Sequence, residues 1–297
     1  MKIRIVLADT DEKYIDHFIR AFKIYYFNEV DIVTFSDSTA LKKYISSRAY
    51  DILLSVASLL PKEAEEKSMI LTSEMGIKEM NGRPAICKYQ KVENLYKGIL
   101  DTIAEQKSGI TYSYETSKES PVIAFTSAAG GVGKTTAALV YTRQLVKKGF
   151  QVMYLSLESF SNIDYFLNAE GSSNFSNVLF AVKCGKGNLQ MKIESSLKQT
   201  YGGVYFFSKP MNPNEIDELD QNEWNEFLDA VRAMGKFHCI VIDLPCANED
   251  TAKKIMPLSD RVLFITDGSD TTTEKTQTLM TCISKYDEVN GSDLSTK

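Results

Sequence analysis

The sequence has 297 residues, of which 43% are hydrophobic and 25% charged, and its formal net charge is −5. This composition excludes a chain that is disordered throughout. The acidic balance argues against sequence-independent DNA binding, which needs a positive surface to neutralise phosphates. The length suggests about two domains.

Cysteine usage and hydropathy indicate the compartment. The five cysteines form no CxxC pair, and with two histidines they give no zinc-ligand spacing, so a reducing environment fits best. The N-terminal stretch lacks the apolar core of a signal peptide, and no run approaches the roughly 18 apolar residues of a membrane span. We therefore expect a cytoplasmic protein with no integral membrane segment.

The first hundred residues alternate between short apolar runs and amphipathic stretches. The runs predicted as buried strands are 3–8, 31–35, 50–57, 68–73 and 84–89. The helices expected between them have apolar residues three and four apart; the first shows Ile15, Phe18, Ile19 and Phe22. Strands separated by helices predict parallel βαβ units, and five repeats predict a doubly wound (βα)5 domain over residues 1–107.

Residues 108–120 are rich in Ser, Thr, Gly and charge, without a sustained period, and are predicted as a linker. Tyr112 and Tyr114 alternate within it, so a short edge strand stays open as an alternative.

A second α/β series follows the linker. The strands predicted there are 122–127, 151–157, 203–208, 238–244 and 261–266. After the first strand we expect a helix with Ala138, Tyr141 and Leu145 on one face, ended by Gly149. This pattern predicts a second, mainly parallel α/β domain over residues 121–297.

The loop between the first strand and helix of this domain reads GGVGKTT. The residues predicted to hold a nucleotide are Gly130, Gly131, Val132, Gly133, Lys134, Thr135 and Thr136. The three glycines let the backbone curl so that N–H groups point at phosphate oxygens. Lys134 adds a cation for the β and γ phosphates, Thr135 offers a hydroxyl to Mg²⁺, and the helix N-terminus adds partial positive charge.

The strict pattern GxxxxGK[ST] is missed at position 128, which is alanine. Alanine is tolerated there only if its backbone stays at negative φ. A tight glycine turn without a ligand would explain the glycines, but not Lys134-Thr135-Thr136 at the start of a helix. Binding of a nucleoside triphosphate is therefore predicted.

At these residues the sequence resembles the MinD/ParA family of P-loop ATPases, whose loop reads KGGxGK[ST]. The stretch FHCIVIDLP, 237–245, resembles the family's second metal motif, with Asp243 in the aspartate position. The resemblance implies ATP and Mg²⁺ as ligands, with Thr135 and Asp243 at the metal, the latter directly or through water. It also implies that QVMYLSLES, 151–159, takes the place of a strand that ends in DxD.

Two departures from that family affect hydrolysis. Ala129 replaces the signature lysine, which reaches the partner's phosphates across a nucleotide-sandwich dimer, and Ser156 and Glu158 replace the two aspartates of DxD. A cation supplied in trans is worth roughly 10³ to 10⁵ in rate, so we expect at most a slow Mg²⁺-dependent ATPase with binding retained. Glu158 is the remaining candidate for positioning water; a plain role as a surface charge stays open.

The MinD/ParA family recognises adenine through an Asn-containing segment late in the fold. No such segment follows the last predicted strand before the sequence ends at DEVNGSDLSTK. Either the sequence stops short of it or the base contacts come from elsewhere, and no adenine ligand is predicted.

The N-terminal half resembles the receiver domain of two-component response regulators. IVLADTDE, 5–12, resembles the first receiver strand with its acidic residues Asp9 and Asp11, ILTS, 70–73, occupies the place of the switch Ser/Thr, and Lys88 is retained. The phosphoacceptor aspartate is missing, because the third strand ends in serine, valine and alanine. This excludes a phosphorylation-dependent regulator, and Asp9 and Lys88 are expected to be a solvated pair rather than a metal or phosphate site.

A non-phosphorylatable receiver in front of a deviant MinD/ParA domain is the arrangement of the TadZ/CpaE family, which helps to place Tad-type (Flp) pilus machinery, typically at a cell pole. The resemblance implies an ATP-dependent homodimer whose receiver-like domain binds pilus-assembly or polar-localisation proteins, with no specific DNA.

Two alternatives remain. A ParA-like partition ATPase would bind DNA, against which the acidic charge and Ala129 argue. A MinD-like ATPase at a membrane surface needs a C-terminal amphipathic helix, which the polar tail NGSDLSTK does not supply unless the chain has been cut short.

Overall fold

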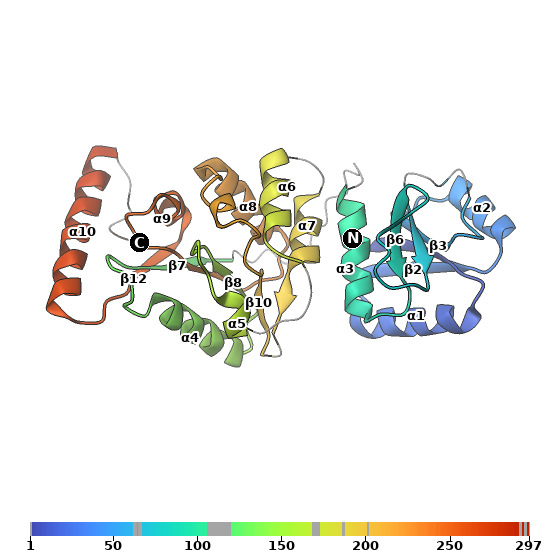
Figure 1. The fold of residues 1–297 in the computed structure, drawn as a ribbon, viewed down its shortest axis with the longest axis horizontal. Helices are drawn as coiled ribbons and strands as arrows, with labels where there is room; N and C mark the ends of the chain where they lie inside the picture. Colours follow the sequence, from blue (N-terminus) through green and yellow to red (C-terminus); the bar gives the residue numbers. More distant parts are fainter. Residues whose placement is uncertain are drawn as a thin grey trace. The chain divides into compact units, whose positions relative to one another are not determined.

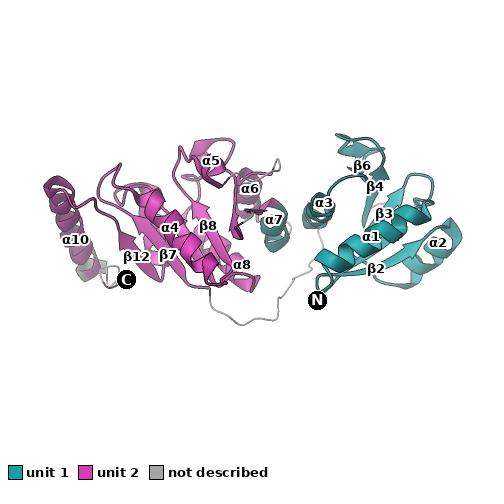
Figure 2. Cartoon of the chain, turned by 90° about the horizontal axis from the view of Figure 1, so that it is seen from below, with its two compact units in different colours: residues 1–112, 186–195 teal, residues 113–185, 196–297 magenta. Residues whose placement is uncertain are grey.

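The computed structural model describes residues 2–61, 64, 67–105, 120–167, 173–185, 188–200, 202–290, 293 and 296. The chain forms two compact units (Figure 1; Figure 2). Unit 1 comprises Met1–Tyr112 and Lys186–Ser195, and unit 2 comprises Ser113–Gly185 and Ser196–Lys297. Apart from Ser120, the predicted linker at 108–120, with its alternative edge strand, lies outside the described residues.

Unit 1 is built on a six-stranded sheet with the order β2-β1-β3-β4-β6-β5. Its strands are β1 (Ile3–Ala8), β2 (Val30–Phe35), β3 (Ile52–Val56), β4 (Ser68–Thr72), β5 (Glu79–Met80) and β6 (Arg83–Cys87). Its helices are α1 (Glu12–Tyr25), α2 (Ser38–Ser47), α3 (Val92–Glu105) and residues 189–195 of α7 (Leu189–Ser196). All strand pairs are parallel except β5 with β6, so the predicted receiver-like α/β class is confirmed.

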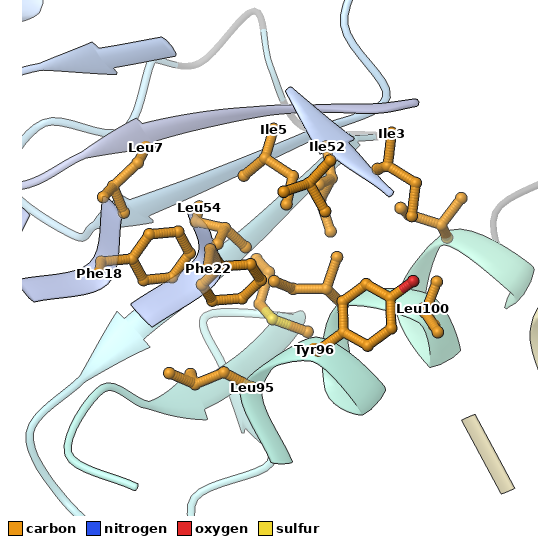
Figure 3. Close-up of a cluster of buried hydrophobic side chains, with 14 of the residues drawn as sticks. Ile3, Ile5, Leu7, Phe18, Phe22, Ile52, Leu54, Leu95, Tyr96 and Leu100 are labelled. Carbon is orange, nitrogen blue, oxygen red and sulfur yellow. The ribbon is translucent and has the colours of Figure 1, made fainter. Parts of the chain in front are cut away.

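The apolar side chains predicted along one face of α1 pack in the core of unit 1. Asp11 caps this helix by accepting hydrogen bonds from the backbone of Lys13 and Tyr14. Phe18 and Phe22 are one turn apart and stack with their ring centroids 4.2 Å apart. Figure 3 shows them packed with Leu95, Tyr96 and Leu100 of α3 against apolar side chains of β1 and β3. Full burial of one such side chain stabilises the fold by roughly 1.5–3 kcal/mol.

The connection between β4 and β6, all of whose residues the structure describes, differs from the predicted (βα)5 pattern. Between β4 and β6 the chain forms turns and the short strand β5 instead of a helix. β5 and β6 make an antiparallel hairpin whose turn has Asn81 at φ 53° and Gly82 at φ 72°. Positive φ at both central positions is the geometry that Asn-Gly favours in two-residue hairpins, so this dipeptide was the overlooked signal.

The helix α7 belongs to unit 1 through its packing. Met191 is 2% exposed and lies in the core cluster of unit 1. The Nζ of Lys192 lies 2.6 Å from Oδ1 of Asp101 and 3.3 Å from Oε1 of Glu105, both on α3. Residues 186–195 therefore complete unit 1 although they follow the first strands of unit 2 in sequence.

Unit 2 contains a six-stranded sheet with the order β12-β7-β11-β8-β10-β9, parallel except for β9 with β10. Its strands are β7 (Val122–Thr126), β8 (Val152–Ser156), β9 (Lys198–Gln199), β10 (Val204–Phe206), β11 (Cys239–Asp243) and β12 (Arg261–Phe264). Its α-helices are α4 (Lys134–Lys147), α5 (Ile163–Leu167), α6 (Ser176–Cys184), α8 (Gln221–Ala233), α9 (Asp250–Ile255) and α10 (Asp270–Asn290). The described part of the unit also has two 3-10 turns, η2 (Pro213–Glu215) and η3 (Met256–Leu258).

In the sheet of unit 2, the carboxyl ends of neighbouring parallel strands lie close to the N-terminus of α4. Ala138 and Leu139 of α4 pack on Val241 of β11 and on neighbouring strands, so α4 covers this face of the sheet. β11 lies between β7 and β8. The carboxyl ends of these parallel strands therefore meet at the N-terminus of α4, where ligands commonly bind in such folds.

Candidate functional site

The predicted phosphate loop connects β7 to α4. Gly131 has φ 79° and Gly133 has φ 90°, so both occupy the left-handed region that favours glycine. The start of the loop is anchored by two hydrogen bonds. The hydroxyl of Thr126 donates to the carbonyl of Pro245 at 2.8 Å, and that of Ser127 donates to the carbonyl of Ala129 at 2.6 Å.

The loop leaves space for a ligand. A Cβ added at Gly130, Gly131 or Gly133 would meet no heavy atom of the protein within 4 Å. Gly130 does not have positive φ, so neither strain nor protein packing accounts for the absence of a side chain there. Among the described residues Asn81 is the one non-glycine with positive φ, so Ala128 meets the condition under which alanine is tolerated.

Lys134 begins α4 and points to Glu158 beyond the end of β8. Its Nζ lies 2.9 Å from Oε1 of Glu158, and its side chain is 8% exposed. Burial alone would lower the pKa of Lys134, but the hydrogen bond and charge of Glu158 outweigh it and raise the pKa. The ammonium is thus charged and paired with the carboxylate that the sequence suggested for positioning water.

Thr135 and Asp243 meet next to this pair. The hydroxyl of Thr135 donates to Oδ2 of Asp243 at 2.8 Å. The hydroxyl of Tyr154 donates to the same oxygen at 3.0 Å. Oδ1 of Asp243 is buried and finds no hydrogen-bond partner within the described chain.

This environment suits a divalent cation. Burial raises the pKa of Asp243 to about 6, although the hydrogen bonds from Thr135 and Tyr154 act in the opposite direction. In the part of the chain that the structure describes, no three acidic, His or Cys side chains form a metal cluster. Mg²⁺ in nucleotide sites is held by one or two protein oxygens together with phosphates and water, so Thr135 and Asp243 fit it. When bound, Mg²⁺ would neutralise phosphate charge.

The remaining predicted site residues lie around the loop. Val132 is half-buried, and Thr136 is exposed in the first turn of α4. Ser156, in the place of the first DxD aspartate, lies with its hydroxyl 2.8 Å from that of Ser161. A hydroxyl pair thus stands where the resembled family has a carboxylate.

In unit 1, Asp9 and Lys88, which resemble an acidic residue and the lysine of receiver domains, form a buried ion pair. Nζ of Lys88 lies 2.9 Å from Oδ2 of Asp9, and the side chains are 9% and 1% exposed, respectively. The expectation of a solvated pair was therefore wrong. Ser55 lies buried in β3, and its hydroxyl donates to the carbonyl of Val56 at 3.0 Å.

A family model described as an AAA domain matches residues 120–296, more than half of the chain. The chain belongs to the AAA domain family. A second model, described as a TadZ-like receiver domain, matches residues 1–104. The predicted TadZ-like receiver domain at the N-terminal end is thus confirmed, and an AAA domain follows it. No curated protein matches the sequence.

Several solved structures resemble the AAA domain. The ParA family ATPase from Chlorobium tepidum is 15% identical, with a TM-score of 0.46, and the match covers 55% of this chain and 66% of that one. MinD in the MinC:MinD cell division complex of Aquifex aeolicus is 20% identical (TM-score 0.47; 57% and 65% covered). MinD with Mg-ADP from Pyrococcus horikoshii is 19% identical (TM-score 0.46; 56% and 66% covered). The chain therefore spans slightly less than two thirds of these proteins.

Within the AAA domain, sequence reasoning missed Tyr154. This tyrosine lies within the predicted apolar strand 151–157, and no role was predicted for it. A buried tyrosine hydroxyl needs a hydrogen-bond partner, and that requirement was the available signal. Its partner, Asp243, could not be identified from the sequence because the two strands are adjacent only in the folded sheet.

Among the described helices, none combines the length and the apolar character that crossing a bilayer requires.

Proposed function

We propose that the chain is a nucleotide-dependent localisation and assembly factor. The AAA domain binds ATP with Mg²⁺, and the bound nucleotide stabilises a homodimer. The observation that supports this proposal best is the meeting of three features at the start of α4. These are the left-handed glycines of the loop, the buried Lys134, and the Thr135–Asp243 pair, in which the buried Oδ1 of Asp243 receives no hydrogen bond from the described residues.

In this proposal occupancy rather than turnover is the signal. Gly130, Gly131, Val132 and Gly133 present backbone N–H groups to the phosphates, the amides of Thr135 and Thr136 extend that set, and Lys134 supplies the cation. The in-trans lysine is absent at Ala129, and Ser156 provides no carboxylate, so hydrolysis is slow. A ligand that binds the dimer and not the monomer stabilises the dimer by mass action.

The match to a TadZ-like receiver domain supports a role in placing Tad-type (Flp) pilus machinery. In this proposal the protein acts in the cytoplasm, at a cell pole. Unit 1 then acts as an interaction surface for pilus-assembly or polar-localisation proteins. The Asp9–Lys88 ion pair favours this passive role, because the acidic residue and lysine that serve phosphorylation in receivers bind each other here.

The test is the molar mass of the purified protein, measured by light scattering without nucleotide, with Mg·ADP and with Mg·ATP. We expect the mass to double with Mg·ATP alone. Lys134→Ala should remain monomeric and bind ATP about 10- to 100-fold more weakly, since a hydrogen bond to a charged group is worth roughly 1.5–3 kcal/mol.

Lys147→Ala is the matched control, because Lys147 lies at the other end of α4 and is exposed. It should behave as the wild type. The same mass under all three conditions and in both variants would refute the proposal.

A further inference from the structure

Tyr154 has an unusual position for a polar side chain. It lies in the middle of β8, is 0% exposed, and pairs in register with Val241 of β11. Side chains two residues apart lie on the same face of a strand, so Tyr154 is on the same side as Asp243. Its ring packs in the core beneath α4, and its hydroxyl reaches the carboxylate at the end of the neighbouring strand.

The hydrogen bonds at Asp243 are asymmetric. Thr135 approaches Oδ2 from α4 and Tyr154 approaches it from the core, at 2.8 Å and 3.0 Å. Oδ1 receives no donor from any residue that the structure describes. Because Thr135 and Tyr154 both donate to Oδ2, they oppose rotation of the Asp243 carboxylate. The position of Oδ1 is therefore fixed as well.

We propose that Tyr154 is a positioning residue for the magnesium site: its hydroxyl holds Oδ2 of Asp243 so that Oδ1 remains available to the cation or to a water bound to it. The inference rests on the proposed function, since it needs a nucleotide site that takes up Mg²⁺. It adds a residue that neither the loop motif nor the second metal motif contains.

The chemistry of the pair supports this role. Burial, followed by the charge and hydrogen bond of Asp243, raises the pKa of Tyr154, so the phenol keeps its proton and acts as a donor. Phenylalanine would fill the same apolar space, so packing alone does not require the hydroxyl. Residues that orient a metal ligand typically change metal affinity by about 10- to 100-fold when they are altered.

The experiment is a Mg²⁺ titration of the binding of mant-ATP, a fluorescent ATP analogue, to the full chain. Tyr154→Phe should need about tenfold more Mg²⁺ for half-maximal enhancement of binding. Its affinity for mant-ATP in EDTA should equal that of the wild type, which also shows that the variant is folded. Tyr141→Phe is the matched control, because Tyr141 is a partly buried tyrosine packed against the same core. It should match the wild type in both measurements.

A double-mutant cycle separates positioning from general structural support. In an Asp243→Asn background, Tyr154→Phe should cause no further change in the Mg²⁺ requirement, because the carboxylate that it orients is gone. A structural role predicts that Tyr154→Phe weakens mant-ATP binding in EDTA and acts equally in both backgrounds.

The outcomes distinguish the two proposals. If the wild type binds mant-ATP with Mg²⁺ enhancement and Tyr154→Phe has the same Mg²⁺ midpoint, the inference is wrong and the proposed function stands. If the wild type fails to bind mant-ATP at any Mg²⁺ concentration, the proposed function is wrong and the inference fails with it.

Discussion

Asp243 is a carboxylate at a fully buried position, and this location has an energetic cost. Burial raises its pKa from 3.8 to about 6, so the folded chain retains a proton at pH values where the unfolded chain has lost it. In the absence of metal, stability therefore falls as the pH rises from 3.8 to about 6, and the loss is complete above that range. The difference corresponds to roughly 3 kcal/mol.

Removal of this buried charge should stabilise the metal-free protein. We expect Asp243→Asn to have a higher free energy of unfolding than the wild type at neutral pH in EDTA, with the gain shrinking as the pH falls below about 6. Urea unfolding can be followed by the fluorescence of Trp224, the single tryptophan, which is buried in unit 2. Asp250→Asn, at a side chain that is 82% exposed, should show no such pH dependence. An Asn variant that is less stable at every pH would contradict the prediction.

Glu158 has two roles to separate, since it pairs with Lys134 and is the candidate for orienting water. Breaking the pair releases Lys134 for phosphates, and because Glu158 is 34% exposed the pair is worth about 1 kcal/mol or less. Glu158→Gln should therefore bind Mg·ATP up to about fivefold more tightly. Residual turnover should fall about 10²-fold if the carboxylate positions water.

Equilibrium binding and single-turnover hydrolysis of radiolabelled ATP measure the two effects of Glu158→Gln. Glu226→Gln, at an exposed position of α8, serves as the control. Tighter binding with unchanged turnover would leave Glu158 only the role of pairing with Lys134.

At the scale of elements, the parallel strands of both sheets were predictable because apolar runs and intervening polar turns determine them locally, whereas the two-residue antiparallel strands β5 and β9 carry no such run. The loop between β7 and α4 was also predictable, since its glycines, lysine and threonine are contiguous. The Lys134–Glu158 and Tyr154–Asp243 contacts were not, because strand order determines them and the sequence does not state that β11 lies between β7 and β8. The β5–β6 hairpin was missed because the alternation of strands and helices was extended over the Asn81-Gly82 turn.

Two glycines of the phosphate loop distinguish the effect of backbone strain from the effect of filling the space that a ligand would occupy. Gly133→Ala places a Cβ at φ 90°, which costs roughly 1–2 kcal/mol, whereas Gly130→Ala meets neither strain nor a neighbouring atom. Both variants should lose Mg·ATP affinity, the second because its methyl group occupies space meant for the ligand. Only Gly133→Ala should lower the urea midpoint reported by Trp224. Undiminished binding by Gly130→Ala would contradict this account of the loop.

At the scale of the whole molecule, unit 1 is assembled from two segments of chain that are far apart in sequence. Residues 188–195, coloured with unit 1 in Figure 2, supply Met191 to its core and Lys192 to the acidic side chains of α3. Local periodicity cannot reveal that this segment belongs to unit 1, because the place where a helix packs depends on the tertiary fold.

The contribution of this segment can be measured by hydrogen exchange. Met191→Ala should speed amide exchange in α3, because loss of a buried methionine side chain costs roughly 2–5 kcal/mol and leaves a cavity beside that helix. Met211→Ala is the matched control, since Met211 is 81% exposed. Equal exchange rates in α3 for both variants would show that α7 contributes little to unit 1.

The two-segment construction of unit 1 also limits how this protein can be re-engineered. A chimera that replaces residues 1–107 with a foreign receiver would retain α7 but remove the helix on which it packs, and would leave Met191 in water. Excision of the N-terminal residues as an isolated fragment would have the opposite defect, an uncovered patch on α3. The receiver and its helical insert should therefore be transplanted together, as one inseparable cassette.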